Sequence, residues 1–170
     1  MDLLNLLGKT WIDELKYPTD LGFGFKQHMP DRELFPLLKK INLQEGNHFI
    51  ILHQRGSHMP YGKILAAEQK VFGDKTANDE YDNTIYATDQ LMKAILHYLE
   101  QQSAQDWLFV YTSDHGQFVT LSVIFRQQWT KIIILCQRCY IPLTVCCNNN
   151  YIKISHNVIV YFISRLLRYC

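Results

Sequence analysis

The sequence predicts an α/β fold in which helices flank a parallel β-sheet. Two short apolar runs, His48–His53 and Trp107–Tyr111, are bounded by polar residues, as is typical of strands buried on both faces. Between them, residues 80–102 place apolar side chains at a helical spacing, so that strand, helix and strand alternate along the chain. Both apolar runs end in residues that could bind ligands, and the carboxyl ends of such strands form the usual binding edge of a parallel sheet.

The remaining elements are indicated less strongly. A short strand is predicted at Thr10–Asp13, upstream of the two main strands. Residues 31–41 are predicted to form a helix, because their leucine and isoleucine side chains share one face and Asp31 can act as the N-cap. In the long helix, Asp82 or Asn83 is expected to cap the first amides.

Length and charge limit the classes of function. A chain of 170 residues can form one domain with its own core. A formal net charge of +1 gives no strong field for nucleic acid, so no nucleic-acid partner is predicted. The sequence shows neither a signal peptide nor an apolar run long enough to span a membrane, which leaves a cytoplasmic location open for this chain.

The end of the chain differs in composition from the rest. All 16 acidic residues lie at or before Asp114, and all five cysteines lie at or after Cys136. Residues 121–170 contain neither an acidic residue nor a glycine, although about six acidic residues would be usual in such a stretch. We therefore predict a globular part, residues 1–120, and an irregular tail, residues 121–170, that packs poorly or stays unpaired with the sheet.

Two segments carry the candidate ligands. Asp114 and His115 follow the second strand directly, and Gly116 allows the backbone to turn there. A carboxylate beside an imidazole supplies half of a zinc site, and the alternative is a turn with a capping Asp and an incidental His. His58 lies in a loop constrained by a glycine and a proline, where it could bind a metal or a phosphate or be an ordinary surface histidine.

Other polar residues leave more than one interpretation. Arg55 could bind an anion through bidentate hydrogen bonds, or it could pair with a nearby carboxylate. Cys136 and Cys139 have the spacing of a zinc or redox pair, but no second pair lies at metal-binding spacing, which disfavours a metal site.

Three motifs in series give the chain a resemblance to a known family. They are Leu52–Tyr61 (LHQRGSHMPY), Tyr81–Ile85 (YDNTI) and Tyr111–Gly116 (YTSDHG). Over roughly residues 1–118 the chain resembles the catalytic domain of the bacterial phosphoethanolamine transferases, which belong to the alkaline-phosphatase/sulfatase superfamily. The likeness is greatest to the lipopolysaccharide-core enzymes that modify the Kdo sugar. The resemblance implies the α/β fold of that superfamily, here in an incomplete form.

The resemblance also implies an activity and a set of site residues. Family members move phosphoethanolamine from phosphatidylethanolamine to lipid A or core sugars of lipopolysaccharide, through a zinc-activated threonine and a phospho-enzyme intermediate. By this resemblance Asp114 and His115 are zinc ligands, and His58 contacts the phosphoethanolamine group. The family is anchored in the inner membrane, and its zinc domain lies in the periplasm.

The chain departs from the family pattern at both ends. The threonine nucleophile, the glutamate zinc ligand, the membrane helices and a second substrate histidine after Asp-His-Gly have no counterpart in this sequence. We therefore expect an inactive fragment, truncated at both ends, whose tail derives from a lost reading frame. The alternatives are another hydrolase or phosphodiesterase of the superfamily, although the sulfatase motif Cys/Ser-x-Pro-x-Arg is absent, and a non-enzymatic remnant or interaction protein.

Overall fold

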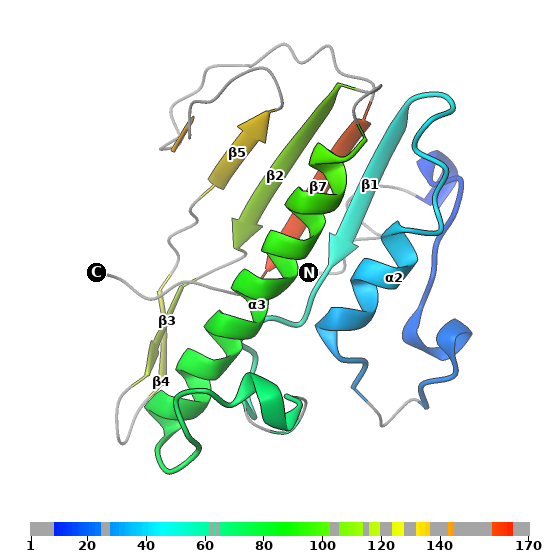
Figure 1. Cartoon of the computed structure of the whole chain (residues 1–170). Helices are drawn as coiled ribbons and strands as arrows, with labels where there is room; N and C mark the ends of the chain where they lie inside the picture. The colour runs from blue at the N-terminus through cyan, green and yellow to red at the C-terminus, as the bar shows by residue number, and fades with distance from the viewer. Residues whose placement is uncertain are drawn as a thin grey trace.

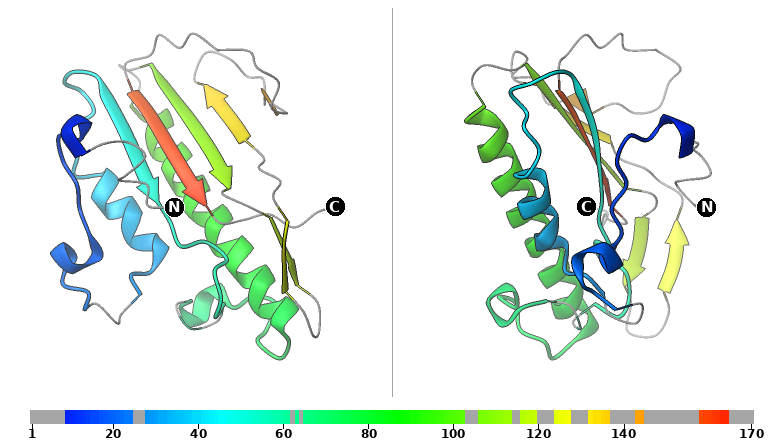
Figure 2. Two further views of the ribbon diagram at one scale, coloured as in Figure 1. Left: turned by 180° about the vertical axis from the view of Figure 1, so that it is seen from behind. Right: turned by 90° about the vertical axis from the view of Figure 1, so that its right-hand side faces the viewer.

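The computed structural model describes residues 9–24, 28–61, 63, 65–102 and 106–113, together with the backbone of segments 116–119, 124–127, 132–136, 143–144 and 158–164. Within these residues, helices lie on one face of a mixed sheet (Figures 1 and 2). The helices are α2 (Leu34–Leu38) and α3 (Ala77–Glu100), and 3₁₀ turns are formed by η1 (Lys9–Trp11), η2 (Pro18–Leu21), η3 (Asp31–Glu33) and η4 (Ala67–Gln69). The strands are β1 (His48–His53), β2 (Trp107–Ser113), β3 (Gly116–Val119), β4 (Ile124–Gln127), β5 (Ile132–Cys136), β6 (Leu143–Thr144) and β7 (Val158–Ser164).

The sheet is parallel in one half and antiparallel in the other. Its strand order is β1-β7-β2-β5-β6, and β3 pairs with β4 in a separate hairpin. Strands β1 and β2 both run parallel to β7, whereas β5 and β6 pair antiparallel. Because His53 and Thr112 are both in register with Ile163, β1 and β2 end at the same edge of the sheet. The predicted α/β class is confirmed, and the prediction of a parallel sheet is correct for β1, β7 and β2 and wrong for the pairings of β5 and β6.

Strand β2 is the buried centre of the domain. Its residues from Trp107 to Thr112 are all buried, and Phe109 is 0% exposed. Apolar side chains of α2 and α3 pack against them, among them Leu38, Ile95 and Leu99. Strand β1 is different, because it is an outermost strand of the sheet and Phe49 is 62% exposed. Burial on both faces was therefore predicted correctly for β2 and wrongly for β1.

Helix α3 begins earlier than its apolar pattern indicates. Thr76 caps it: the Thr76 hydroxyl accepts from the Asp79 amide at 3.1 Å, and the Asp79 carboxylate accepts from the Thr76 amide at 3.0 Å. This reciprocal capping box replaces the predicted cap at Asp82 or Asn83. Asn83 instead holds the preceding loop, since its side chain accepts from the Phe72 amide at 2.9 Å. No helix in the described part of the chain is both long and apolar enough to cross a membrane.

The segment before β1 also differs from the prediction. Residues 9–11 form a 3₁₀ turn, and Trp11 is 86% exposed, so the short strand predicted there is wrong. The helix predicted over residues 31–41 is a 3₁₀ turn followed by five α-helical residues. Asp31 does not cap this helix, because its carboxylate binds two amides of a distant loop.

Strands of the predicted tail pair with the sheet. Strand β7 lies between β1 and β2, and β5 pairs with β2 on its other side (Figure 1). The expectation that residues 121–170 stay unpaired is therefore wrong for β5, β6 and β7. The physical reason is that a central strand requires an uninterrupted β-branched or apolar run, which Val158–Ser164 provides without turn residues of its own. The origin of the tail and the division at residue 120 stay predictions.

Candidate functional site

The candidate site is the edge of the sheet at which β1 and β2 end. The segment Gln54–Tyr61, here called the His58 loop, follows β1 at this edge. Asp114 and His115 follow Ser113 in the sequence, but both lie outside the described residues. One strand, β7, separates β1 from β2, so the ends of β1 and β2 are about 10 Å apart. The proximity of Asp114 and His115 to His58 therefore stays a prediction.

The His58 loop is packed against the domain. Gln54 is 1% exposed, Ser57 is 0% exposed and Tyr61 is 3% exposed, whereas the only fully buried residue of β1 is Leu52. Connecting loops normally run over the surface and are mobile, so burial of this degree indicates a loop held in one conformation. His58 itself is half-buried between these anchored residues.

The first anchor of the loop is Asp31. One carboxylate oxygen of Asp31 accepts from the Arg55 amide and the other from the Gly56 amide, each at 2.8 Å. Burial raises the pKa of Asp31 above its ordinary value of 3.8, although the two amides and the nearby charges of Arg55 and His53 act in the opposite direction. The carboxyl group thus sits in a partly desolvated position that the loop backbone compensates with hydrogen bonds.

The second anchor is a pair of buried hydroxyl groups. The Thr84 hydroxyl of α3 donates to the Tyr81 carbonyl oxygen at 2.6 Å, and the Ser57 hydroxyl forms a short hydrogen bond with Thr84. A hydroxyl has one proton to donate. Because Thr84 gives its proton to Tyr81, Ser57 is the donor to Thr84. This bond connects the middle of the His58 loop to α3.

Two further contacts fix the end of the loop. The Tyr61 and Tyr81 rings meet edge to face, with centroids 5.4 Å apart, a geometry that adds to the energy of burial. Within the loop, Nη2 of Arg55 donates to the carbonyl oxygens of His58 at 3.1 Å and of Met59 at 2.9 Å. The Arg55 guanidinium thus binds the loop itself, and binding of an anion by Arg55 stays a prediction.

The orientation of the His58 ring follows from the same loop. Its Nδ1 lies 2.6 Å from the Met59 carbonyl oxygen, which can only accept a hydrogen bond. Nδ1 therefore carries the proton, and Nε2 is the ring nitrogen available to a ligand. With a neutral ring Nε2 accepts from an ammonium group, and with a protonated ring it donates to a phosphate oxygen.

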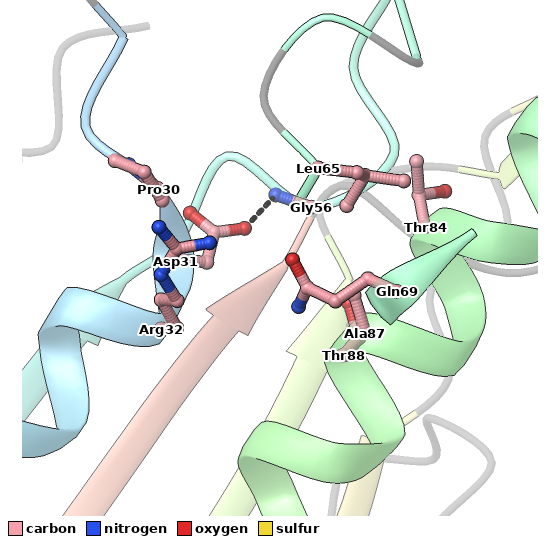
Figure 3. A pocket seen from close by; sticks show the side chains of 9 residues that line it. All are labelled: Pro30, Asp31, Arg32, Gly56, Leu65, Gln69, Thr84, Ala87 and Thr88. Atoms are coloured by element: carbon pink, nitrogen blue, oxygen red, sulfur yellow. Dashed lines mark hydrogen bonds between the residues drawn. The ribbon is translucent and has the colours of Figure 1, made fainter. Parts of the chain in front are cut away.

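A small hollow lies beside the loop, between η3 and α3. Its volume is about 20 Å³, which is room for about one water molecule. Figure 3 shows the Asp31 carboxylate directed at the Gly56 amide, with Gln69 and Thr84 among the side chains around it. The lining residues are Pro30, Asp31, Arg32, Gly56, Leu65, Gln69, Thr84, Ala87 and Thr88. The hollow is too small for a phosphoethanolamine group, so this is not where such a ligand would bind.

Zinc is the cofactor that the sequence predicts for this edge. Within the described ranges, no three His, Cys, Asp or Glu side chains come together in a way that could hold a metal ion. Asp114 and His115 are of types that zinc accepts, but two ligands do not make the four-coordinate site that zinc prefers. The described side chains do not fit a complete zinc site, and zinc binding by Asp114 and His115 stays a prediction.

Asp31 and Thr84 are parts of this site that the sequence does not predict. Asp31 contacts backbone that is 24 and 25 residues away, and Ser57 and Thr84 are 27 residues apart, so no local pattern indicates either contact. Thr84 lies in the second of the three motifs, YDNTI, and the series of motifs is the one signal that could have connected it with the loop.

Two curated relatives carry the names of phosphoethanolamine transferases. A protein of Haemophilus influenzae named "Putative phosphoethanolamine transferase" is 29% identical over 151 residues, covering 77% of this chain and 30% of the relative. "Phosphoethanolamine transferase EptA" of Helicobacter pylori is 29% identical over 126 residues, covering 66% of this chain and 24% of the relative. The chain thus spans less than a third of the length of either relative. No solved structure matches the chain.

The relatives confirm the resemblance that the three motifs predict. A family model described as Sulfatase matches residues 6–129, a range that includes β1, α3, β2 and the His58 loop. The matched range covers more than half of the chain, and on this match the chain belongs to the sulfatase family.

Proposed function

We propose that this chain supplies part of the catalytic domain of a phosphoethanolamine transferase. In this proposal the donor is phosphatidylethanolamine and the acceptor is a sugar of lipopolysaccharide, and the proposal is supported by the names of the two relatives and by the three motifs. By the same resemblance, the site would work at the surface of the inner membrane that faces the periplasm.

The observation that carries the proposal is the shared edge of β1 and β2. Both strands are in register with β7, so the His58 loop and the segment that begins with Asp114 start from the same edge of one sheet. Ligand sites of open α/β sheets lie at this edge. The proposal assigns His58 to the phosphoethanolamine group and Asp114 and His115 to the metal.

The chemistry of His58 suits a zwitterionic headgroup. Its Nδ1 donates to the Met59 carbonyl oxygen, and its Nε2 makes no hydrogen bond with the described residues. Depending on its protonation, Nε2 donates to a phosphate oxygen or accepts from the ammonium group. We assign His58 to binding and orientation of the headgroup, and no bond-making step to any described residue.

The test is a nuclear magnetic resonance titration of the 170-residue chain with O-phosphorylethanolamine, and separately with inorganic phosphate, sulfate and ethanolamine. We expect phosphorylethanolamine to shift the signals of residues 56–61 and the separate ions to shift them less. His58→Gln should abolish the response. His97→Gln is the matched control, because the His97 side chain is 71% exposed on α3.

The outcomes separate the two enzyme classes. A response to phosphorylethanolamine that depends on His58 supports the proposal. An equal response to phosphate or sulfate alone would instead favour another hydrolase of the superfamily, and no response at all would reject the assignment of His58.

A further inference from the structure

The His58 loop changes direction where it leaves β1. Gly56 has φ 58°, a left-handed conformation that residues with a Cβ adopt at a cost. The backbone of Arg55 and Gly56 therefore determines the direction in which residues 57–61 run, and with it the place at which His58 is presented. Whatever fixes these two peptide groups fixes the loop.

One carboxylate holds both peptide groups. Oδ1 of Asp31 accepts from the Arg55 amide and Oδ2 accepts from the Gly56 amide, each at 2.8 Å. Two consecutive amides that converge on one anion form a nest, which is an arrangement that also binds phosphate. Because Asp31 fills this nest, a substrate phosphate has to bind elsewhere. Because each amide binds its own oxygen, Asp31 fixes the orientation of the two peptide groups and their distance from its carboxylate.

Arg55 extends the connection from Asp31 to His58. The charge of its guanidinium lies close enough to Asp31 to lower the pKa of that carboxyl group, and His53 at the end of β1 acts in the same direction. Nη2 of the same guanidinium donates to the carbonyl oxygens of His58 and Met59. The backbone on both sides of the His58–Met59 peptide is thus linked through Arg55 to Asp31.

The other anchors act on a different part of the loop. Ser57 binds Thr84 and Tyr61 packs on Tyr81, and both of these partners belong to α3. Asp31 belongs to η3, so it connects the beginning of the loop to a different element. Without Asp31, the α3 contacts would still hold side chains of the loop, but the bend at Gly56 would lose its hydrogen bonds.

We propose that Asp31 is the positioning residue of the His58 loop: by holding the amides of Arg55 and Gly56, its carboxylate determines where the His58 imidazole is presented. The consequence for ligand binding rests on the proposed function. The placement of the loop does not, and the two are measured separately.

The variant that tests the proposal is Asp31→Asn. Its side chain is the same size, but an NH₂ group replaces one oxygen and faces an amide donor, so one of the two hydrogen bonds is lost. The matched control is Asp79→Asn, because the Asp79 carboxylate accepts its hydrogen bond from the Thr76 amide at the start of α3, outside the loop. Both variants replace a hydrogen-bonded carboxylate by a neutral amide, but the loop should respond to Asp31→Asn only.

Three signals are measured by nuclear magnetic resonance on the full chain. In Asp31→Asn we expect the protection of one of the two amides, Arg55 or Gly56, against hydrogen exchange to fall about tenfold or more, because one bond to a charged acceptor is lost. We expect the ring shifts of His58 to change from the Nδ1–H form toward those of a free histidine. We expect the dissociation constant for O-phosphorylethanolamine to rise. In Asp79→Asn all three should match the unmodified chain.

A measurement on the unmodified chain covers the case in which Asp31→Asn does not fold. The carboxyl carbon of Asp31 and the amides of Arg55 and Gly56 should titrate with one common midpoint. If the amide signals of Arg55 and Gly56 do not follow the titration of Asp31, the proposal is overturned. It is also overturned if the ring shifts of His58 are unchanged in Asp31→Asn, or if they change equally in Asp79→Asn. If the unmodified chain binds no phosphorylethanolamine, the proposed function fails, and the exchange and ring signals still decide the role of Asp31.

Discussion

The buried hydroxyl pair Ser57–Thr84 offers a test in which the direction of a hydrogen bond predicts an asymmetry. Thr84→Val keeps the branched shape of the side chain and removes the acceptor of the Ser57 proton. Ser57 is 0% exposed, so its hydroxyl then has to remain buried without that partner. Ser57→Ala is less severe, because Thr84 keeps its own donor bond to the Tyr81 carbonyl oxygen at 2.6 Å.

The expected magnitudes follow from the cost of an unsatisfied buried group. Thr84→Val should lower the free energy of unfolding by about 1–3 kcal/mol, and Ser57→Ala by about 0.5–1.5 kcal/mol. In the double variant both partners are gone, so its loss should fall below the sum of the single losses by about 1 kcal/mol. For a chain of this size, each 1 kcal/mol corresponds to about 2–4 °C in melting temperature.

Urea denaturation, followed by circular dichroism and by tryptophan fluorescence, gives these free energies if the two probes coincide. Thr10→Val, the same change at an exposed position, should change the free energy of unfolding by less than about 0.5 kcal/mol. Additive single losses would show that the two hydroxyls do not interact. A larger loss for Ser57→Ala than for Thr84→Val would refute the assignment of Ser57 as the donor.

Three further predictions concern the sheet, pH and zinc. Because Val160 pairs with Ile50 on one side and Phe109 on the other, Val160→Pro should destabilise the chain by about 3 kcal/mol or more, and an unchanged melting curve would remove β7 from the sheet. Because burial raises the pKa of Asp31, its carboxyl group binds a proton more readily in the folded than in the unfolded chain. The free energy of unfolding of the unmodified chain should therefore fall, relative to that of Asp31→Asn, as pH rises through the raised pKa. Calorimetry should show weak zinc binding at most, and sub-micromolar affinity that survives Asp114→Ala would contradict the assignment of this residue as a ligand.

The elements that the sequence predicts well are those determined by local patterns. Strand β2 is an unbroken apolar run, and α3 repeats its apolar residues at helical spacing, so each can be recognised without knowledge of its neighbours. The apolar stripe predicts a start at residue 80, three residues late, because the helix begins at the capping box of Thr76 and Asp79, which precedes the stripe. That signal was present in the sequence.

The features that the sequence did not predict depend on contacts between distant residues. The position of β7 between β1 and β2 is determined by sheet pairing, which its apolar run permits but does not specify. The role of Asp31 depends on two amides that approach it only in the folded chain. An Asp at the start of a helical pattern favours a cap, and here the tertiary contact with Gly56 prevails over that local preference.

The geometry gives the second motif a structural role beside the first. Tyr81 packs against Tyr61 at 5.4 Å, and Thr84 accepts the hydrogen bond of Ser57, so two residues of YDNTI hold two residues of the His58 loop. A loop that is already ordered before its ligand arrives loses little conformational entropy on binding. If His58 binds the headgroup as proposed, Tyr81 and Thr84 would contribute to affinity by keeping His58 in place, so the proposed site would extend from the sheet edge into the first turns of α3.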